Sequence, residues 1–154
     1  KEGGSGVWRE VLHDGFRLPT SAEWEWACRA GTSGPRYGRL DDIAWYVDNS
    51  QATTHIVGQK SPNAWGLYDT LGNVHEWCWD RARPPAESWA HRETPLPGLG
   101  VGGTLNQGGE ELRVLRGGSF SNPASVIRAA QVGFMPPRYS FSNLGFRCAR
   151  TLFF

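Results

Sequence analysis

The residue types that most often carry chemistry are few in this sequence and lie far apart. The three cysteines are Cys28, Cys78 and Cys148, and no two of them have the short spacing that holds zinc. The four histidines, at positions 13, 55, 75 and 91, form no pair one helical turn apart that would bind a metal. Ser119 follows Arg-Gly-Gly, which is not the Gly-x-Ser-x-Gly turn of a hydrolase. These patterns predict neither a hydrolase triad nor a histidine-built metal centre.

One helix is predicted over residues 20–30. Thr20 is a favourable N-cap, and Glu23 stands three residues later, as a capping box requires. Gly31 supplies a stop at the C-terminal end. Three residues at helical spacing form one apolar face, which we expect in the core: Trp24, Ala27 and Cys28.

Short strands and loops are expected after that helix. The segment 74–79 alternates, which predicts a strand. One face carries Val74, Glu76 and Cys78, and the other carries His75, Trp77 and Trp79. Further strands are predicted at residues 44–47, 55–57, 112–116, 126–130 and 144–149. The pattern is typical of an α+β protein with few helices.

The composition describes a single domain with much irregular structure. The 154 residues include 20 Gly, 10 Pro and 8 Trp, so turns are frequent and tryptophan supplies much of the buried area. We treat residues 1–154 as one domain in which 82–111 form a long Pro/Gly-rich insertion.

Charge and hydropathy exclude some classes of partner. The net charge of +1 gives no bulk electrostatic case for nucleic acid, and no apolar run reaches the roughly 18 residues of a membrane span. The first residues do not have the pattern of a signal peptide, which leaves cell surface and cytoplasm both open.

Four segments, in order, resemble the formylglycine-generating-enzyme (sulfatase-modifying factor) family. They are residues 15–26, 63–69, 71–77, and 116–119 with its closing 144–147. The resemblance implies a C-type-lectin-like fold of the formylglycine-generating-enzyme type, with few helices, small antiparallel sheets and much loop. Members of the family have more chain before the first of these motifs, so we expect the domain to be incomplete at its N-terminus.

The resemblance also implies that the family's oxidase chemistry is absent. Formylglycine-generating enzymes hold copper with two cysteines, and soft thiolates are what bind Cu(I). The corresponding positions here are Asn122 and Ile127. We therefore expect no catalytic residues and no required cofactor. A related branch, the sulfoxide synthases, uses iron held by histidines of a separate domain, and the scattered histidines here give no such set.

A structural calcium ion is a further implication of the resemblance. The family site would use the carboxylates of Asp69 and Glu76 with the backbone carbonyls of Gly72 and Val74, which are the oxygen donors that Ca²⁺ takes. The alternative is that Glu76 is buried and paired with an arginine, such as Arg116 or Arg147.

A disulfide is implied on the same ground. Cys28 and Cys148 occupy positions that pair in some family members, and their redox state depends on the compartment. Cys78 is expected to be a buried free thiol.

The segment 119–147 resembles, in addition, the variable region of retroelement-diversified proteins that share this lectin fold. In those proteins a fixed frame encloses positions rewritten from Asn codons. Aromatic residues among Gly, Pro and Ser are typical of a contact surface, although two or three of them would fill the core on the alternative interpretation. The expected ligand-binding residues are Phe120, Ser121, Asn122, Ser125, Gln131, Val132, Gly133, Phe134, Met135, Arg138, Tyr139, Ser140, Phe141 and Ser142.

The sequence therefore favours a ligand-binding protein over an enzyme. Its expected ligand is another protein or a cell-surface molecule, bound without insertion into a membrane, and the oligomeric state stays open. The alternative is a non-oxidase enzyme or accessory domain of the same family that acts with a missing domain.

Overall fold

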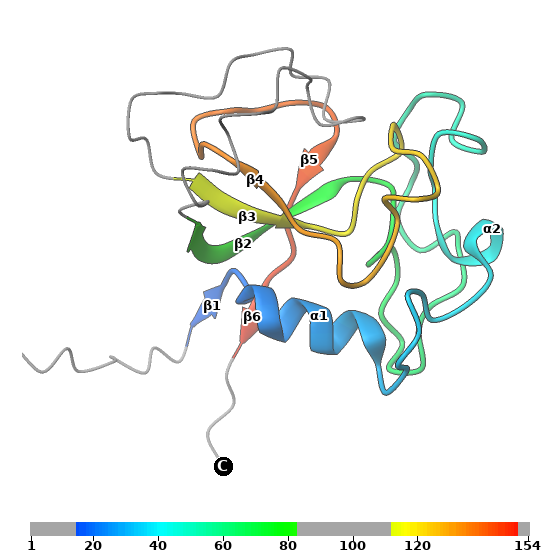
Figure 1. Ribbon diagram of the computed structural model, residues 1–154, viewed down its shortest axis with the longest axis horizontal. Coiled ribbons are helices and arrows are strands. Elements are labelled where there is room, and N and C mark those ends of the chain that lie inside the picture. The colour runs from blue at the N-terminus through cyan, green and yellow to red at the C-terminus, as the bar shows by residue number, and fades with distance from the viewer. Residues whose placement is uncertain (1–14, 83–111, 151–154) are drawn as a thin grey trace, which may run out of the picture.

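The computed structural model describes residues 15–82 and 112–150 (Figure 1). Within them, two helices and six strands are joined by long loops, which confirms the predicted α+β composition. The expected insertion at 82–111 lies outside the described residues apart from Ala82. No helix in the described part has the length and apolar character needed to cross a membrane.

A four-stranded sheet forms the centre of the molecule, in the order β4-β3-β2-β5. Its strands are β2 (His75–Ala82), β3 (Leu112–Arg116), β4 (Gly133–Met135) and β5 (Leu144–Gly145). β3 pairs antiparallel with β2 and β4, whereas β5 pairs parallel with β2. A second sheet joins β1 (Phe16–Arg17) to β6 (Ala149–Arg150).

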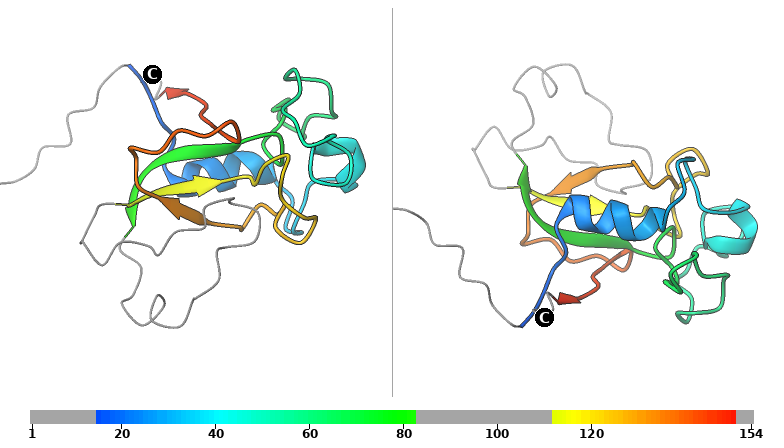
Figure 2. Two further views of the ribbon diagram at one scale, coloured as in Figure 1. Left: turned by 90° about the horizontal axis from the view of Figure 1, so that it is seen from above. Right: turned by 90° about the horizontal axis from the view of Figure 1, so that it is seen from below.

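Helix α1 (Ser21–Arg29) lies across one face of the central sheet, and the connection from β4 to β5 passes over the other (Figures 1 and 2). The short helix α2 (Leu40–Ile43) lies among the loops at one end of the molecule. The sheet therefore separates a helix-covered face from a loop-covered face.

The predicted capping box of α1 is confirmed. The Glu23 amide donates to the Thr20 hydroxyl at 3.2 Å, and the Thr20 amide donates to the Glu23 carboxylate at 2.8 Å. The helix ends when Ala30 adopts a left-handed conformation with φ 44°, one residue before the glycine expected to stop it. Trp24 and Cys28 are buried, which confirms the core face, while Ala27 is half-buried.

The strand predictions are confirmed where the segment pairs with a neighbouring strand and are wrong where it makes only isolated backbone hydrogen bonds. Residues 112–116 form β3 as predicted, and β2 extends three residues past its predicted end. The strands predicted at 44–47, 55–57 and 126–130 are wrong, because these segments are loops held by isolated bonds. Asn73 donates to the Trp45 carbonyl, for example, and Ala129 to that of Pro35. The segment 144–149 splits into β5 and β6, and β4 was not predicted.

Gly72 allows two loops to approach closely. Its φ is +78°, and a Cβ atom there would lie 2.3 Å from the Trp45 carbonyl oxygen. The Gly72 amide donates to the Gly117 carbonyl at 3.0 Å. A side chain at position 72 would therefore separate the loop before β2 from residues 44–46.

The helix-covered face of the sheet carries the main core. Buried residues of α1, the loops and the strands pack together there, and Val132 and Phe134 pack partly against them. The cluster contains Trp24, Cys28, Ile43, Ala44, Tyr46, Leu71, Cys78, Val114, Ile127 and Ala129. By strand alternation, Leu115 and Met135 face the other side, where they too are buried.

A buried carboxylate joins three parts of this fold. Glu76 on β2 is 5% exposed, and its oxygens accept hydrogen bonds from Trp24 Nε1 at 2.6 Å and from Arg147 at 2.5 and 2.6 Å. Burial by itself lowers the pKa of Arg147, but the hydrogen bond and charge of Glu76 outweigh it and raise that pKa above its ordinary value. The pair connects β2 both to α1 and to the segment between β5 and β6.

A buried arginine, Arg116, holds the loop before β4. Arg116 donates to Glu25 and Ser21 on α1, each at 2.9 Å, and to the carbonyls of Ala129 and Gln131. The loop is therefore tied to the helix through a side chain of β3.

The substitution Glu76→Gln is expected to destabilise the domain by about 3 kcal/mol, because it leaves the half-buried Arg147 guanidinium without its counter-charge. Urea unfolding followed by tryptophan fluorescence measures the loss. Asp42→Asn is the matched control, since Asp42 pairs with Arg39 at 3.7 Å on the surface, where a pair is worth about 1 kcal/mol or less. Equal losses for the two variants would contradict the central role of Glu76.

Candidate functional site

The loop at residues 136–142, here called the recognition loop, presents a stack of side chains to solvent. The rings of Tyr139 and Phe141 are stacked, with centroids 5.7 Å apart and planes 12° from parallel. The Arg138 guanidinium lies 4.9 Å from the centre of the Tyr139 ring, and Phe141 is 38% exposed. The stack offers a flat aromatic area beside a positive charge, which is a combination common at protein interfaces.

The other predicted contact residues are exposed to different extents. Ser125, Ser140 and Ser142 are exposed, whereas six of the predicted residues are half-buried, Tyr139 of the stack among them. The half-buried positions are Ser121, Gln131, Val132, Gly133, Phe134 and Tyr139.

Three residues predicted to contact ligand are buried, and their placement on the surface was wrong. Phe120 is 8%, Asn122 1% and Met135 4% exposed. The Asn122 side-chain oxygen accepts from the Ser119 amide at 2.8 Å and from its hydroxyl at 2.9 Å, which holds the start of the segment. Met135 ends β4 with its side chain in the interior. These residues support the surface rather than form it.

Phe134 packs against the core, as the alternative interpretation of the aromatic residues expected. It pairs with Val114 in the β3–β4 register and packs against the main core, as does Val132. The outward aromatics of the segment are therefore Tyr139 and Phe141.

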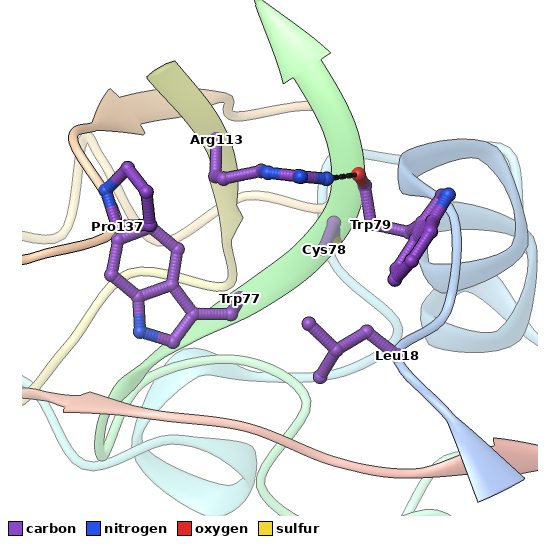
Figure 3. Close-up of a pocket in the computed structure, with 6 residues that line it drawn as sticks. All are labelled: Leu18, Trp77, Cys78, Trp79, Arg113 and Pro137. Carbon is purple, nitrogen blue, oxygen red and sulfur yellow. Dashed lines mark hydrogen bonds between the residues drawn. The ribbon is translucent and has the colours of Figure 1, made fainter. Parts of the chain in front are cut away.

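An apolar recess of about 290 Å³ lies beside the recognition loop. It is lined by Leu18, Trp77, Cys78, Trp79, Arg113 and Pro137, and Figure 3 shows Trp77 beside Pro137 while Arg113 reaches toward Trp79. Arg113 donates to the Trp79 carbonyl, and its guanidinium lies 5.4 Å from the centre of that ring, which is 60% exposed.

Sequence reasoning placed Trp77 and Trp79 on one face of a strand but did not assign them to the site. The alternation itself was the signal, because two large aromatics on one strand face need either a partner layer or a ligand.

The two positions where the family resemblance places copper-binding cysteines are buried. Asn122 binds Ser119, and Ile127 is fully buried in the main core. Neither side chain offers a thiolate to Cu(I).

The residues predicted to bind calcium do not fit that ion. Both Glu76 oxygens are occupied by Arg147 and Trp24, as the alternative interpretation expected, and a guanidinium at that carboxylate repels a cation. Asp69 Oδ2 accepts from the Gly58 amide at 2.7 Å, which leaves only Oδ1 without a partner in the described structure. The described residues contain no group of three or more His, Cys, Asp or Glu side chains placed to hold a metal.

The disulfide implied between Cys28 and Cys148 is not formed. Cys28 on α1 is fully buried, whereas Cys148 is exposed next to β6, and both are free thiols. Cys78 is a buried free thiol, as expected. Burial raises the pKa of Cys28 to about 11 and that of Cys78 to about 12, so both stay protonated and unreactive at neutral pH.

His75 is buried beneath the start of residues 119–147, here called the variable-type segment. It is 4% exposed, its amide donates to the Asn143 carbonyl at 2.8 Å, and its Nε2 has no hydrogen-bond partner among the described residues. Burial lowers the pKa of His75 from 6.5 to about 4, although the neighbouring Asn122 side chain acts in the opposite direction. His75 is therefore neutral at physiological pH.

The substitution His75→Gln is expected to flatten the pH dependence of the unfolding free energy between pH 6.5 and pH 4. The folded-state pKa of His75 lies below the unfolded value, so between these two values the unfolded wild type takes up a proton that the folded protein does not. The unfolding free energy therefore decreases as the pH is lowered through this window. The full shift corresponds to about 3 kcal/mol. Urea unfolding at several pH values measures the slope, and identical slopes in variant and wild type would refute the assignment.

Glu23 affects that measurement only at the acid end of the window, and equally in the variant and the wild type. The hydrogen bond from Arg17 lowers the pKa of Glu23 from 4.5 to about 2, so its contribution is present above pH 4.5 and is lost only below it.

Comparison with known proteins agrees with this architecture. The model of the sulfatase-modifying factor enzyme 1-like domain matches residues 4–152. The formylglycine-generating enzyme of Streptomyces coelicolor is 36% identical over 88% of the chain and 46% of its own length, and that of Mus musculus is 32% identical over 88% and 39%. The chain thus spans less than half of the length of these relatives.

Solved structures give the same assignment. Treponema denticola variable protein 1 superimposes with a TM-score of 0.69 at 40% identity, over 89% of this chain and 48% of that protein. PvdO from Pseudomonas aeruginosa also gives a TM-score of 0.69, at 28% identity over 89% and 53%. The chain belongs to the sulfatase-modifying factor enzyme 1-like family and has the C-type-lectin-like fold of formylglycine-generating enzymes.

Proposed function

We propose that this domain is a ligand-binding protein of the retroelement-diversified type, with the recognition loop at the centre of its contact surface. The observation that carries the proposal is the outward stack of Arg138, Tyr139 and Phe141 on a loop whose neighbours are buried and bonded. Aromatic side chains that stay exposed on an ordered loop are typical of recognition surfaces.

The arrangement of fixed and variable-type positions supports the proposal. The segment is anchored near its start by Ser119 and Asn122, in the middle by Met135, and at its end by Arg147 on Glu76. Adenine-directed change of an Asn codon does not reach methionine or glutamine, so Met135 and Gln131 do not fit that route; Met135 is buried and Gln131 is half-buried. The exposed serines and aromatics of the loop are all reachable by that route.

The similarity to variable protein 1 of Treponema denticola supports the same proposal, as does the lack of thiolates at positions 122 and 127. Without the two sulfur ligands the chain has no means of binding Cu(I) as the family's oxidases do. The relationship to formylglycine-generating enzymes is thus one of scaffold.

The double substitution Tyr139→Ser and Phe141→Ser is expected to cost about 1 kcal/mol in unfolding free energy, because Phe141 is exposed and Tyr139 is only half-buried. Phe134→Ala, in the same segment, is expected to cost about 2 kcal/mol or more, because Phe134 packs against the core. Chemical denaturation of the three proteins tests the contrast. A larger loss in the double variant would show that the stack is structural.

The genetic neighbourhood of the coding sequence provides an independent test. We expect a near-identical repeat of the stretch for residues 119–147, differing at adenines, together with a reverse transcriptase. Sequencing of the source locus checks this. Genes for sulfatases or for a thiol-histidine pathway in that place would instead favour a non-oxidase enzyme or accessory domain.

A further inference from the structure

We propose that a groove between helix α1 and the β1–β6 sheet, here called the α1 groove, takes a neutral, proline-rich segment of a partner protein. The groove lies on the helix-covered side of the molecule, away from the β4–β5 connection that carries the recognition loop (Figures 1 and 2). The inference therefore does not depend on the proposed function. Three features carry it: exposed indole rings, hydrogen-bond donors that have no partner within the described residues, and charges that are already paired.

The α1 groove has an apolar floor and an aromatic wall. Its volume of about 350 Å³ lies within the roughly 300–1,000 Å³ of ligand sites, so it has room for a short stretch of chain. Trp24 and Thr70 line it from the interior, where both are buried, and Trp26 lines it from the exposed side of α1. Further apolar lining comes from Pro19, Ala27, Leu67 and Ala149.

Two tryptophan rings are exposed beside the groove. Trp26 is 69% and Trp65 45% exposed, and their rings meet edge to face, with centroids 4.3 Å apart and planes at 62°. Neither indole N–H has a hydrogen-bond partner within the described residues. Large rings that lie exposed side by side are typical of a contact surface, and an indole N–H at such a surface is available to a partner.

The polar atoms that the groove offers to a partner are hydrogen-bond donors. Arg147 uses Nε and Nη2 to bind the Glu76 carboxylate and the Tyr68 carbonyl, and its Nη1 has no hydrogen-bond partner in the described part of the chain. The Trp26 N–H is a second donor at the same groove. Guanidinium and indole groups donate hydrogen bonds and cannot accept them. A partner that brings acceptors is therefore favoured.

The charged groups at the groove are largely satisfied within the chain. Glu23 is the only carboxylate among the described lining residues, and it accepts from Arg17 at 2.6 and 2.7 Å and from the Thr20 amide at 2.8 Å. The Arg147 guanidinium is paired with Glu76. These pairs favour a neutral partner over a strongly charged one.

A proline-rich segment has the chemistry that these features select. In the polyproline II conformation the backbone carbonyls make no internal hydrogen bonds, and proline has no N–H that would need an acceptor. Aromatic-lined grooves recognise such segments in other proteins. An ordinary extended segment would instead bring one backbone N–H per residue to a groove whose carboxylate is already occupied.

Selection from a library of random peptides about twelve residues long, on the wild type and on Trp26→Ala, tests the inference. Trp26 is mostly exposed, so the variant should stay folded, which urea unfolding checks. We expect the peptides that bind only the wild type to carry two or more prolines spaced about three residues apart, which is one turn of polyproline II. Trp26-dependent peptides without proline would overturn the inference, and so would a selection in which no peptide depends on Trp26.

The dissociation constant of the best synthetic peptide, measured by fluorescence anisotropy, separates the ring from the donor. Trp26→Ala is expected to weaken binding about tenfold, and Trp26→Phe, which keeps a ring but removes the N–H, about threefold. Ile56→Ala is the matched control, because Ile56 is 76% exposed and does not line the groove. Equal effects of Trp26→Ala and Ile56→Ala would overturn the inference.

Replacing the prolines of that peptide by alanine tests the chemistry of the partner. Binding should weaken about tenfold, because each alanine adds an N–H and loosens the polyproline II conformation. Unchanged binding would show that the groove takes any apolar segment. Binding of the wild type, but not of Trp26→Ala, to neutral phosphatidylcholine vesicles would show a lipid-binding face instead. Both outcomes overturn the inference and leave the proposed function, which concerns the recognition loop, untouched.

Discussion

The buried carboxylate of Glu76 is the interaction on which the rest of the structure depends. A charge in that position is tolerable only because Arg147 and Trp24 donate three hydrogen bonds to it. The donors come from opposite ends of the chain, so one side chain of β2 fixes both α1 and the residues that follow β5. The recognition loop ends just before this point, and its position is set by the same ion pair.

The two faces of the central sheet have different roles because they are covered differently. On one face α1 and the main core provide most of the buried apolar contact. On the other, a thinner layer that includes Leu115, Met135 and His75 lies beneath irregular loops. Loops over such a layer can vary in their outward residues while the sheet keeps its geometry. The division explains how a family known for enzymes also contains a scaffold suited to recognition.

The sequence predicts those helices and strands whose signals lie within a few neighbouring residues. Thr20 and Glu23 form their capping box within one turn of helix, and the alternation in β3 is visible in five residues. The loops at 44–46 and 126–130 could not be predicted, because their apolar residues are buried by distant partners rather than by a ladder. Composition likewise identified the aromatic segment but not the orientation of each ring. Pairing with Val114 turns Phe134 inward, and no sequence period shows this.

The anchors of the variable-type segment have a consequence for the energetics of association. A loop held at its start, middle and end has little conformational entropy left to lose, and ordering a side chain at an interface otherwise costs about 0.5–1.5 kcal/mol. The stacked rings of Tyr139 and Phe141 already restrict one another. On the proposed function, each new residue placed on this surface would meet its target in a preorganised setting, and a small number of substitutions would be enough to redirect specificity.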